Sequence, residues 1–165
     1  MQCRGSNRLK SNANTGGDRK IITCSSPNFD DRPTPEISVL VLHYTGMPSC
    51  EEALARLVNP ASKVSAHYLV DEDGTVYALA PEEKRAWHAG VSHWRGRDNV
   101  NDVSIGVEIV NPGHEFGYRA FPAPQMEAVA TLSREILARH PIPARNVVAH
   151  SDVAPLRKED PGELF

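Results

Sequence analysis

Three features that define broad protein classes are absent from this sequence: an excess of positive charge, a long apolar run and a regular set of cysteines. The formal net charge is −3, which argues against the basic surface that nucleic-acid binding requires. No apolar run is long enough to cross a membrane, and residues 1–20 are polar, without the apolar core of a secretory signal. We therefore expect a cytoplasmic protein that binds neither nucleic acid nor membrane.

The cysteines favour the same location. Cys3, Cys24 and Cys50 are odd in number, widely spaced and form no C-x-x-C pair, so they do not imply a disulfide framework. No hydrophobic segment precedes Cys3, which makes it a poor candidate for lipid attachment. A reducing, cytoplasmic setting is the simplest interpretation.

Length and composition predict one globular domain. The chain has 165 residues, of which 40% are hydrophobic and 24% are charged, values typical of a single domain with its own core. We expect residues 1–24 to form a flexible extension and residues 25–165 to form the folded domain. The Pro- and Asp-rich segment 26–35 should run extended over the surface. A monomer is the default expectation.

Apolar periodicity predicts the strands of this domain. Residues 37–44 are apolar at nearly every position, as in a strand covered on both faces. Residues 103–110 alternate, which places Glu108 on the face with the small residues. Asp73-Gly74 predicts a tight turn between two further strands, and Val147-Val148 predicts a short edge strand.

Two helices are predicted beside these strands. Ser49 and Glu52 form a capping box that opens a short helix, and residues 124–140 have the apolar spacing of an amphipathic helix packed on a sheet. The fold class that follows is a single α/β domain, with a central mixed β-sheet flanked by helices.

Two histidines and one carboxylate stand where such a fold places ligands. His43 ends the first strand, His150 follows the edge strand, and Asp160 precedes a Pro-Gly turn. Open α/β sheets bind ligands at the carboxyl ends of their strands, and two histidines with a carboxylate leave one position open on a catalytic zinc. Each residue also has an ordinary interpretation, as a satisfied edge histidine or as part of a plain turn.

Glu108 and Lys158 would complete a hydrolytic site around such a zinc. Zinc at an open site lowers the pKa of bound water to about 7. Glu108 could deprotonate that water and pass the proton to a leaving amine, and Lys158 could stabilise the oxyanion. These roles fit amide hydrolysis better than redox chemistry, although Glu108 could equally be a surface residue of a half-exposed sheet.

Five sequence blocks carry a resemblance to one enzyme family. They are V-L-H-Y-T-G from Val41, S-A-H-Y-L-V-D-E-D-G from Ser65, R-A-W-H-A-G from Arg85, S-I-G-V-E-I-V-N from Ser104 and A-H-S-D-V-A-P-L-R-K-E-D-P-G from Ala149. Over residues 25–165 the chain closely resembles the zinc-dependent N-acetylmuramoyl-L-alanine amidases of the type 2 amidase family, especially the AmpD-like cytoplasmic recycling enzymes.

The resemblance implies a cofactor, a set of roles and a substrate. It implies Zn²⁺ held by His43, His150 and Asp160, with Glu108 as the catalytic glutamate and Lys158 as the lysine that stabilises the transition state. The reaction implied is hydrolysis of the amide between the lactyl group of N-acetylmuramic acid, often in its 1,6-anhydro form, and the L-alanine of the stem peptide. The expected partner is a muropeptide, in peptidoglycan degradation and recycling.

Aromatic and basic residues in and beside these blocks are candidates for substrate contact. They are Tyr44, Trp87, His88, Trp94 and Arg97. Trp87 could equally be a buried core residue. The loop with Trp94 and Arg97 could reach a carboxylate of the peptide or could simply be solvated. His67 is expected to be structural or to line the groove.

The sequence departs from the family pattern at two points. Ala66 stands where phage-type members carry a tyrosine, which removes a tyrosine-assisted mechanism and leaves more of the work to Glu108. The chain stops at Phe165, soon after Asp160, whereas relatives usually continue. We therefore expect a C-terminally truncated chain whose Asp160 loop is less well held.

Two other functions would use the same residues. A recognition module would bind muramyl peptides without cutting them, but such relatives typically lack one of the ligands, so the full trio counts against it. A peptidase that cuts within the stem peptide would use the same metal chemistry and would differ in its products. We predict the amidase.

Overall fold

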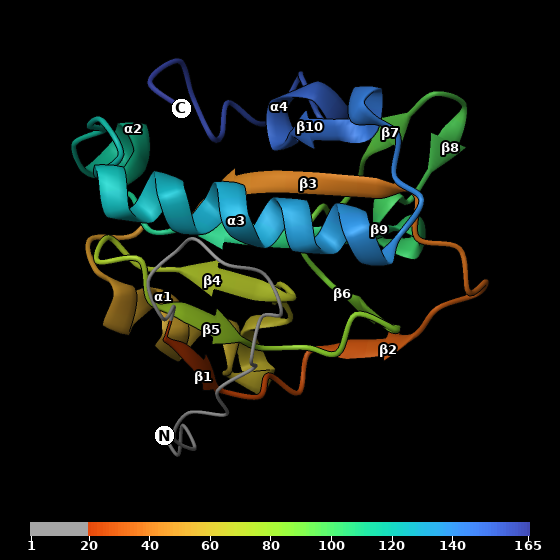
Figure 1. Cartoon of the computed structure of the whole chain (residues 1–165), viewed down its shortest axis with the longest axis horizontal. Coiled ribbons are helices and arrows are strands. Elements are labelled where there is room, and N and C mark those ends of the chain that lie inside the picture. Colours follow the sequence, from red (N-terminus) through yellow and green to blue (C-terminus); the bar gives the residue numbers. More distant parts are fainter. Residues whose placement is uncertain (1–19) are drawn as a thin grey trace.

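Two six-residue strands, β3 (Val39–Tyr44) and β9 (Ser104–Ile109), lie side by side at the centre of the fold. The computed structural model describes residues 20–165, and Figure 1 shows these strands between layers of helix and loop. Every residue of β3 before Tyr44 is buried, because both faces of the sheet are covered. The strand predicted at residues 37–44 is therefore confirmed, with its start at Val39.

Both strands belong to a six-stranded mixed sheet with the order β1-β5-β4-β9-β3-β10. The neighbours β10 and β3, β3 and β9, and β9 and β4 are parallel, whereas β5 turns back antiparallel to β4 at the predicted Asp73-Gly74 turn. The remaining strands of this sheet are β1 (Ile21–Thr23), β4 (Tyr68–Val70), β5 (Val76–Ala78) and β10 (Val147–Ala149). The mixed sheet and the edge strand before His150 match the sequence predictions.

Shorter elements surround the main sheet. Two antiparallel pairs are formed by β2 (Phe29–Asp31) with β6 (Lys84–Ala86) and by β7 (His93–Trp94) with β8 (Arg97–Asp98). Single turns of 3₁₀ helix are η1 (Pro60–Ser62), η2 (Val100–Val103) and η3 (Ala144–Asn146). Two short α-helices are α2 (Gly113–Phe116) and α4 (His150–Val153).

Two longer helices cover opposite faces of the sheet (Figure 1). α3 (Ala123–Arg139) buries Leu132 and Ile136 in the core cluster that contains Ile105 of β9. α1 (Cys50–Leu57) begins at its predicted cap, where Ser49 Oγ accepts a hydrogen bond from the backbone N–H of Glu52. Both helices were expected from the sequence. Within residues 20–165, no helix is long and apolar enough to cross a membrane.

The folded domain begins earlier than the sequence predicts. Residues 21–23 form β1 and pair in parallel with β5 at one edge of the sheet, so residues 20–24 belong to the domain and not to an extension. The rest of the predicted extension, residues 1–19, lies outside the described residues. The periodicity of three strand residues is too short a signal to identify an edge strand.

The segment 26–35 is also less exposed than predicted. Asn28 is buried, and its Nδ2 donates hydrogen bonds to the carbonyl groups of Asn59 and Val64 at 2.9 and 2.8 Å. These bonds tie the segment to the loop after α1. Polar composition predicted a surface position, but each buried polar group here has a partner that offsets the cost of desolvation.

The cysteines differ from the expectation as well. Cys24 is buried and disulfide-bonded, whereas Cys50 in α1 is a free thiol. Structural disulfides are typical of oxidising compartments and are rare in the cytosol. The bonded state of Cys24 thus differs from the unpaired cysteines that the spacing suggested.

Two glycines with similar backbone angles offer a test of how closely the β4–β5 turn approaches α3. Gly74 and Gly96 have φ of +87° and +83°, but only at Gly74 would a Cβ meet other atoms, at 2.9 Å from the carbonyl oxygen of Pro124. We expect Gly96→Ala to lower the free energy of unfolding by about 1–2 kcal/mol, the cost of a left-handed conformation, and Gly74→Ala to lower it further. Urea unfolding measures both, and equal losses would contradict the close approach.

Candidate metal centre

The register of three parallel strands brings His150, His43 and Glu108 to the same level of the sheet. Glu108 of β9 pairs directly with His43 of β3. On the other side of β3, Ala149 of β10 pairs with Leu42, so His150, the next residue, comes level with His43. All three strands run in the same direction, so these residues meet at one carboxyl edge of the sheet, as the sequence predicts for His43 and His150.

Asp160 reaches the same edge from the loop that follows α4. The backbone N–H of Ser151 donates to the Asp160 carbonyl at 3.0 Å, and Tyr118 Oη donates to the Pro161 carbonyl at 2.9 Å. The Tyr118 ring also lies so close to Gly162 that a Cβ there would overlap it. The sequence led us to expect a loosely held loop, but hydrogen bonds on both sides of Asp160 hold it.

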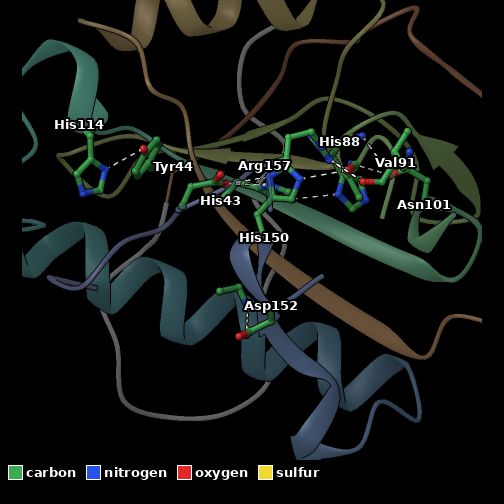
Figure 2. A network of polar contacts seen from close by, with 12 residues as sticks. His43, Tyr44, His88, Val91, Asn101, His114, His150, Asp152 and Arg157 are labelled. Atoms are coloured by element: carbon green, nitrogen blue, oxygen red, sulfur yellow. Dashed lines mark hydrogen bonds and ion pairs between the residues drawn. The ribbon is translucent and has the colours of Figure 1, made fainter. Parts of the chain in front are cut away.

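The donor atoms of the three predicted ligands face one another, and Figure 2 shows His43 beside His150. His43 Nδ1 lies 2.8 Å from His150 Nδ1 and 3.2 Å from Asp160 Oδ2, and His150 Nδ1 lies 3.0 Å from the same oxygen. All three side chains are buried. Tetrahedral coordination by nitrogen and oxygen at about 2.0–2.1 Å spaces donor atoms by about 3.3 Å. The arrangement therefore forms a possible metal site with two histidines and one carboxylate.

The opposite ring nitrogens show which atoms are free to bind a metal. His150 Nε2 lies 3.1 Å from the Ala89 carbonyl oxygen, which can only accept, so the Nε2 proton is donated there. A neutral imidazole then keeps a lone pair on Nδ1. His43 has the same arrangement, with Nδ1 toward the site and Nε2 3.0 Å from His88 Nδ1. This pattern fits metal-binding histidines, whose second nitrogen is normally hydrogen-bonded.

Burial sets the charges of the donor atoms. It lowers the pKa of His43 to about 4, against the opposing influence of the Asp160 carboxylate, so the imidazole is neutral near pH 7. Burial alone would raise the pKa of Asp160, but the close approach of the His150 and His43 rings outweighs it and lowers the pKa below its usual value. Two neutral nitrogens and one carboxylate oxygen are the protonation states that a divalent metal requires.

Glu108 has the opposite shift. Burial, with a smaller contribution from the Asp160 carboxylate, raises the pKa of Glu108 well above its usual value. Its Oε2 atom is buried and has no hydrogen-bond partner among residues 20–165. A carboxyl group with a raised pKa beside a possible metal site has the properties of a general acid or base.

A cleft opens beside the metal site and carries Lys158. Its volume is about 520 Å³, and it is lined by Tyr44, Pro155, Leu156, Arg157, Lys158, Glu159 and Asp160. The positive charge of Lys158 acts on both His43 and Glu108, so the ammonium group lies near both side chains. The cleft thus combines a possible metal site, a carboxyl group and an ammonium group, which suits polar hydrolytic chemistry.

Comparison with known proteins agrees with this geometry. A family model of N-acetylmuramoyl-L-alanine amidases matches residues 32–163. The chain belongs to that family. It is 38% identical to the N-acetylmuramoyl-L-alanine amidase AmiD of Escherichia coli, over 93% of this chain and 60% of that protein. It is 36% identical to the 1,6-anhydro-N-acetylmuramyl-L-alanine amidase AmpD of Salmonella typhimurium, over 85% of this chain and 82% of that protein.

The fold is similar to that of a solved amidase. The structure of E. coli AmiD in complex with the substrate anhydro-N-acetylmuramic acid-L-Ala-D-γ-Glu-L-Lys superposes with a TM-score of 0.73 and 42% sequence identity. The match covers 79% of this chain and 55% of that one. The chain therefore spans little more than half the length of this relative, and the match concerns the amidase domain.

Three of the predicted substrate-binding residues lie at different places around the centre. Tyr44 lines the cleft, and its Oη lies 3.0 Å from His114 Nδ1. His88 is buried behind His43, as Figure 2 shows. The pKa of Asp30 in β2 is lowered mainly by Arg85 and in part by the Trp87 side chain, which therefore lies near the β2–β6 pair. Of these three side chains, only that of Tyr44 reaches the cleft.

Trp94 and Arg97 lie on the β7–β8 hairpin and have partners within the chain. Trp94 Nε1 donates to Asn146 Oδ1 at 3.1 Å, and Asn146 Nδ2 donates to the Ser38 carbonyl at 2.8 Å. Arg97 forms an ion pair with Glu36. Both contacts lie at the start of β3, whereas His43 lies near its end. Their role in substrate binding stays a prediction.

Arg157 has a role that the sequence did not indicate, because beside Lys158 it was expected to be only a solvated neighbour. Arg157 Nη2 donates to the carbonyl groups of Ala89 and Val91 at 2.8 Å each, and the Ala89 carbonyl also accepts from His150. Figure 2 shows Arg157 close to His150. Arg157 thus ties the loop after β6 to the loop that carries Asp160. The one signal for this contact in the sequence was Gly90. It has a positive φ, and its missing Cβ leaves room for Arg157.

The raised pKa of Glu108 predicts a pH-dependent stability difference in the metal-free amidase. The folded state holds the proton more tightly than the unfolded state, so this contribution to stability is full below the unfolded pKa of about 4.3 and is lost as pH rises. We expect Glu108→Gln to leave the free energy of unfolding unchanged at pH 4 and to increase it at pH 8. Urea unfolding at both pH values measures this.

Glu51→Gln on the exposed surface of α1 makes the same change of formal charge and serves as the control. Equal effects of Glu108→Gln at pH 4 and pH 8 would show that the Glu108 carboxyl group is not held in a desolvated site.

Proposed function

We propose that this protein is a zinc-dependent N-acetylmuramoyl-L-alanine amidase. It hydrolyses the amide between the lactyl group of N-acetylmuramic acid and the L-alanine of the stem peptide. The observation that carries the proposal is the convergence of the His43, His150 and Asp160 donor atoms beside Glu108 at one edge of the sheet. Membership of the amidase family supports the choice of an amide as the bond that is cut.

Zinc is the metal that fits the donor set. Two imidazole nitrogens and one carboxylate oxygen form a three-ligand set that catalytic zinc sites use, with a fourth position open, and sites for calcium or magnesium use oxygen ligands instead. When bound, zinc supplies Lewis acidity, which acidifies a water molecule and polarises a carbonyl group.

Glu108 moves the proton in this proposal. Positive charge added at the ligand site favours its ionised form, so Oε2 accepts a proton from the attacking water. The same oxygen then donates that proton to the nitrogen of the leaving L-alanine. Its lack of another hydrogen-bond partner among residues 20–165 leaves Oε2 available for both steps.

Lys158 stabilises charge that develops on the substrate. Its ammonium group lies in the cleft, near His43 and Glu108, and within residues 20–165 it forms no ion pair with a carboxylate. A free ammonium group in a partly enclosed site can hydrogen-bond the oxyanion of the tetrahedral intermediate, where such a contact is worth about 10²- to 10³-fold in rate.

The proposed substrate is a muropeptide, with the 1,6-anhydro sugar as the preferred form. Similarity to AmpD, which is named for the 1,6-anhydro sugar, and to AmiD, solved with an anhydro-muramyl tripeptide, supports this choice. A recognition module that only binds this ligand and a peptidase that cuts inside the stem peptide remain the alternatives that the first experiment separates.

We infer cytoplasmic recycling as the physiological role, because of the similarity to AmpD. The disulfide at Cys24 favours a second candidate, action on wall material in an oxidising compartment. Trapping of free thiols in protein taken from its own cells separates the two: a reduced Cys24 supports recycling in the cytoplasm, and an oxidised Cys24 contradicts it.

The reaction is tested by mass spectrometry of an anhydro-muramyl tetrapeptide incubated with the zinc-loaded protein. We expect intact tetrapeptide and free anhydro sugar, loss of both products after chelation, and recovery when zinc is restored. Fragments of the tetrapeptide would indicate a peptidase instead. Tight binding of the muropeptide without any product, by a protein that holds zinc, would indicate a recognition module.

The role of Lys158 is tested by Lys158→Met, which removes the ammonium group and keeps an unbranched side chain that is one atom shorter. We expect kcat to fall by about 10²- to 10³-fold, with the zinc dissociation constant unchanged, because Lys158 is not a ligand. Arg134→Met on the exposed face of α3 removes a positive charge away from the cleft and should leave kcat unchanged. A variant at Lys158 with wild-type kcat would exclude the proposed role.

A further inference from the structure

A buried chain of polar groups runs behind His43, on the side away from the other two ligands. His43 Nε2 lies 3.0 Å from His88 Nδ1, and His88 Nε2 lies 3.1 Å from Ser104 Oγ. The exposed fractions of the three residues are 1%, 8% and 0%. The side chain of His88 is therefore almost completely enclosed and is poorly placed to touch a substrate in the cleft, the role that the sequence suggested.

The position of the metal site determines the direction of these hydrogen bonds. His43 turns Nδ1 toward His150 and Asp160, so metal binding requires a lone pair on Nδ1 and a proton on Nε2. That proton can be donated only to the Nδ1 atom of His88. His88 must then carry its own proton on Nε2 and donate it to Ser104 Oγ. In this polar chain, Ser104 thus fixes the tautomer of His88, and His88 fixes the tautomer of His43.

Independent contacts hold His88 in place. The backbone N–H groups of His88 and Ala89 both donate to Asn101 Oδ1, at 3.2 and 2.8 Å. The imidazole ring lies directly over Gly106 of β9, where a Cβ atom would overlap it. The ring therefore occupies the one place in β9 where a side chain is missing, between Ser104 and Glu108 on the same face. The alternation of small residues along β9 makes room for it.

We propose that His88 is a positioning residue for the metal centre, which fixes the tautomer and the orientation of His43 through its Nδ1 atom. The inference rests on the proposed zinc function. Hydrogen-bond partners of metal-binding histidines typically change metal affinity by about 10- to 100-fold when they are removed. His88 is suited to this role because it is buried, rigidly held and offers a single acceptor to His43.

The test is the zinc dissociation constant of folded variants, measured by competition with a chromogenic chelator. We expect His88→Ala to raise it about 10- to 100-fold. His88→Asn places an amide oxygen near the position of Nδ1 and should recover most of the affinity. The visible absorption of the cobalt-substituted protein provides a second readout: His88→Ala should alter the spectrum, because the ligand field reports the orientation of His43.

Two further variants disturb the polar chain of His43, His88 and Ser104 without removing His88. Gly106→Ala displaces the ring, and Ser104→Ala removes the acceptor for His88 Nε2, so both should weaken zinc binding. Ile136→Ala serves as the stability control, since Ile136 is fully buried in the core cluster around α3 and has no contact with the polar chain. It should lose stability with an unchanged zinc dissociation constant.

The proposal is overturned if folded His88→Ala binds zinc within twofold of the wild type, or if Ile136→Ala loses as much affinity. Should His88→Ala fail to fold, unchanged affinity in both Gly106→Ala and Ser104→Ala overturns it equally. The comparison of zinc dissociation constants does not depend on whether the protein catalyses the amidase reaction. A wild-type protein that binds zinc without releasing peptide would contradict the amidase function, while the comparison of dissociation constants would still decide the role of His88.

Discussion

The in-register pairing of three parallel strands is the constraint on which the metal centre depends. Because β10, β3 and β9 run in the same direction, their carboxyl ends meet at one edge, and the pairing of Glu108 with His43 and of Ala149 with Leu42 sets the three functional side chains level. A slip of one residue in any pair would turn a side chain to the opposite face. Buried aliphatic residues on both faces of β3 make such a slip costly.

The second constraint is the desolvation of charge at that edge. The pKa of Asp160 is lowered because the His150 and His43 rings approach its carboxylate, whereas Glu108 Oε2 has no hydrogen-bond partner among residues 20–165 and burial raises the pKa of that group. The pKa values of the two carboxyl groups therefore shift in opposite directions within one site, which suits the proposed roles of Asp160 as a ligand and Glu108 as a proton carrier. The difference between their pKa values comes from the groups that surround each carboxyl group and not from residue type. Neighbouring carboxyl groups can therefore have distinct roles.

The R-A-W-H-A-G block shows that side-chain positions outside regular strands are difficult to predict from the sequence. From the resemblance, both ring residues of the block were expected to line the substrate cleft. The two side chains lie in different places: Trp87 lies near Asp30 on the small β2–β6 pair, and His88 lies beside His43. Trp94 and Arg97 on the β7–β8 hairpin have partners at the start of β3. Side-chain direction in irregular segments depends on contacts that are distant in sequence.

The sequence by itself determined the main strands and helices and the residue types of the proposed ligands. The apolar run before His43, the alternation around Glu108 and the amphipathic spacing of α3 are local patterns with a period of two or 3.6 residues, and such periods can be read without the fold. Only the tertiary structure decided that residues 20–24 join the sheet, that Asn28 and Cys24 are buried, and that Arg157 ties two loops together. These features depend on pairings between distant segments, which leave no periodic trace in the chain.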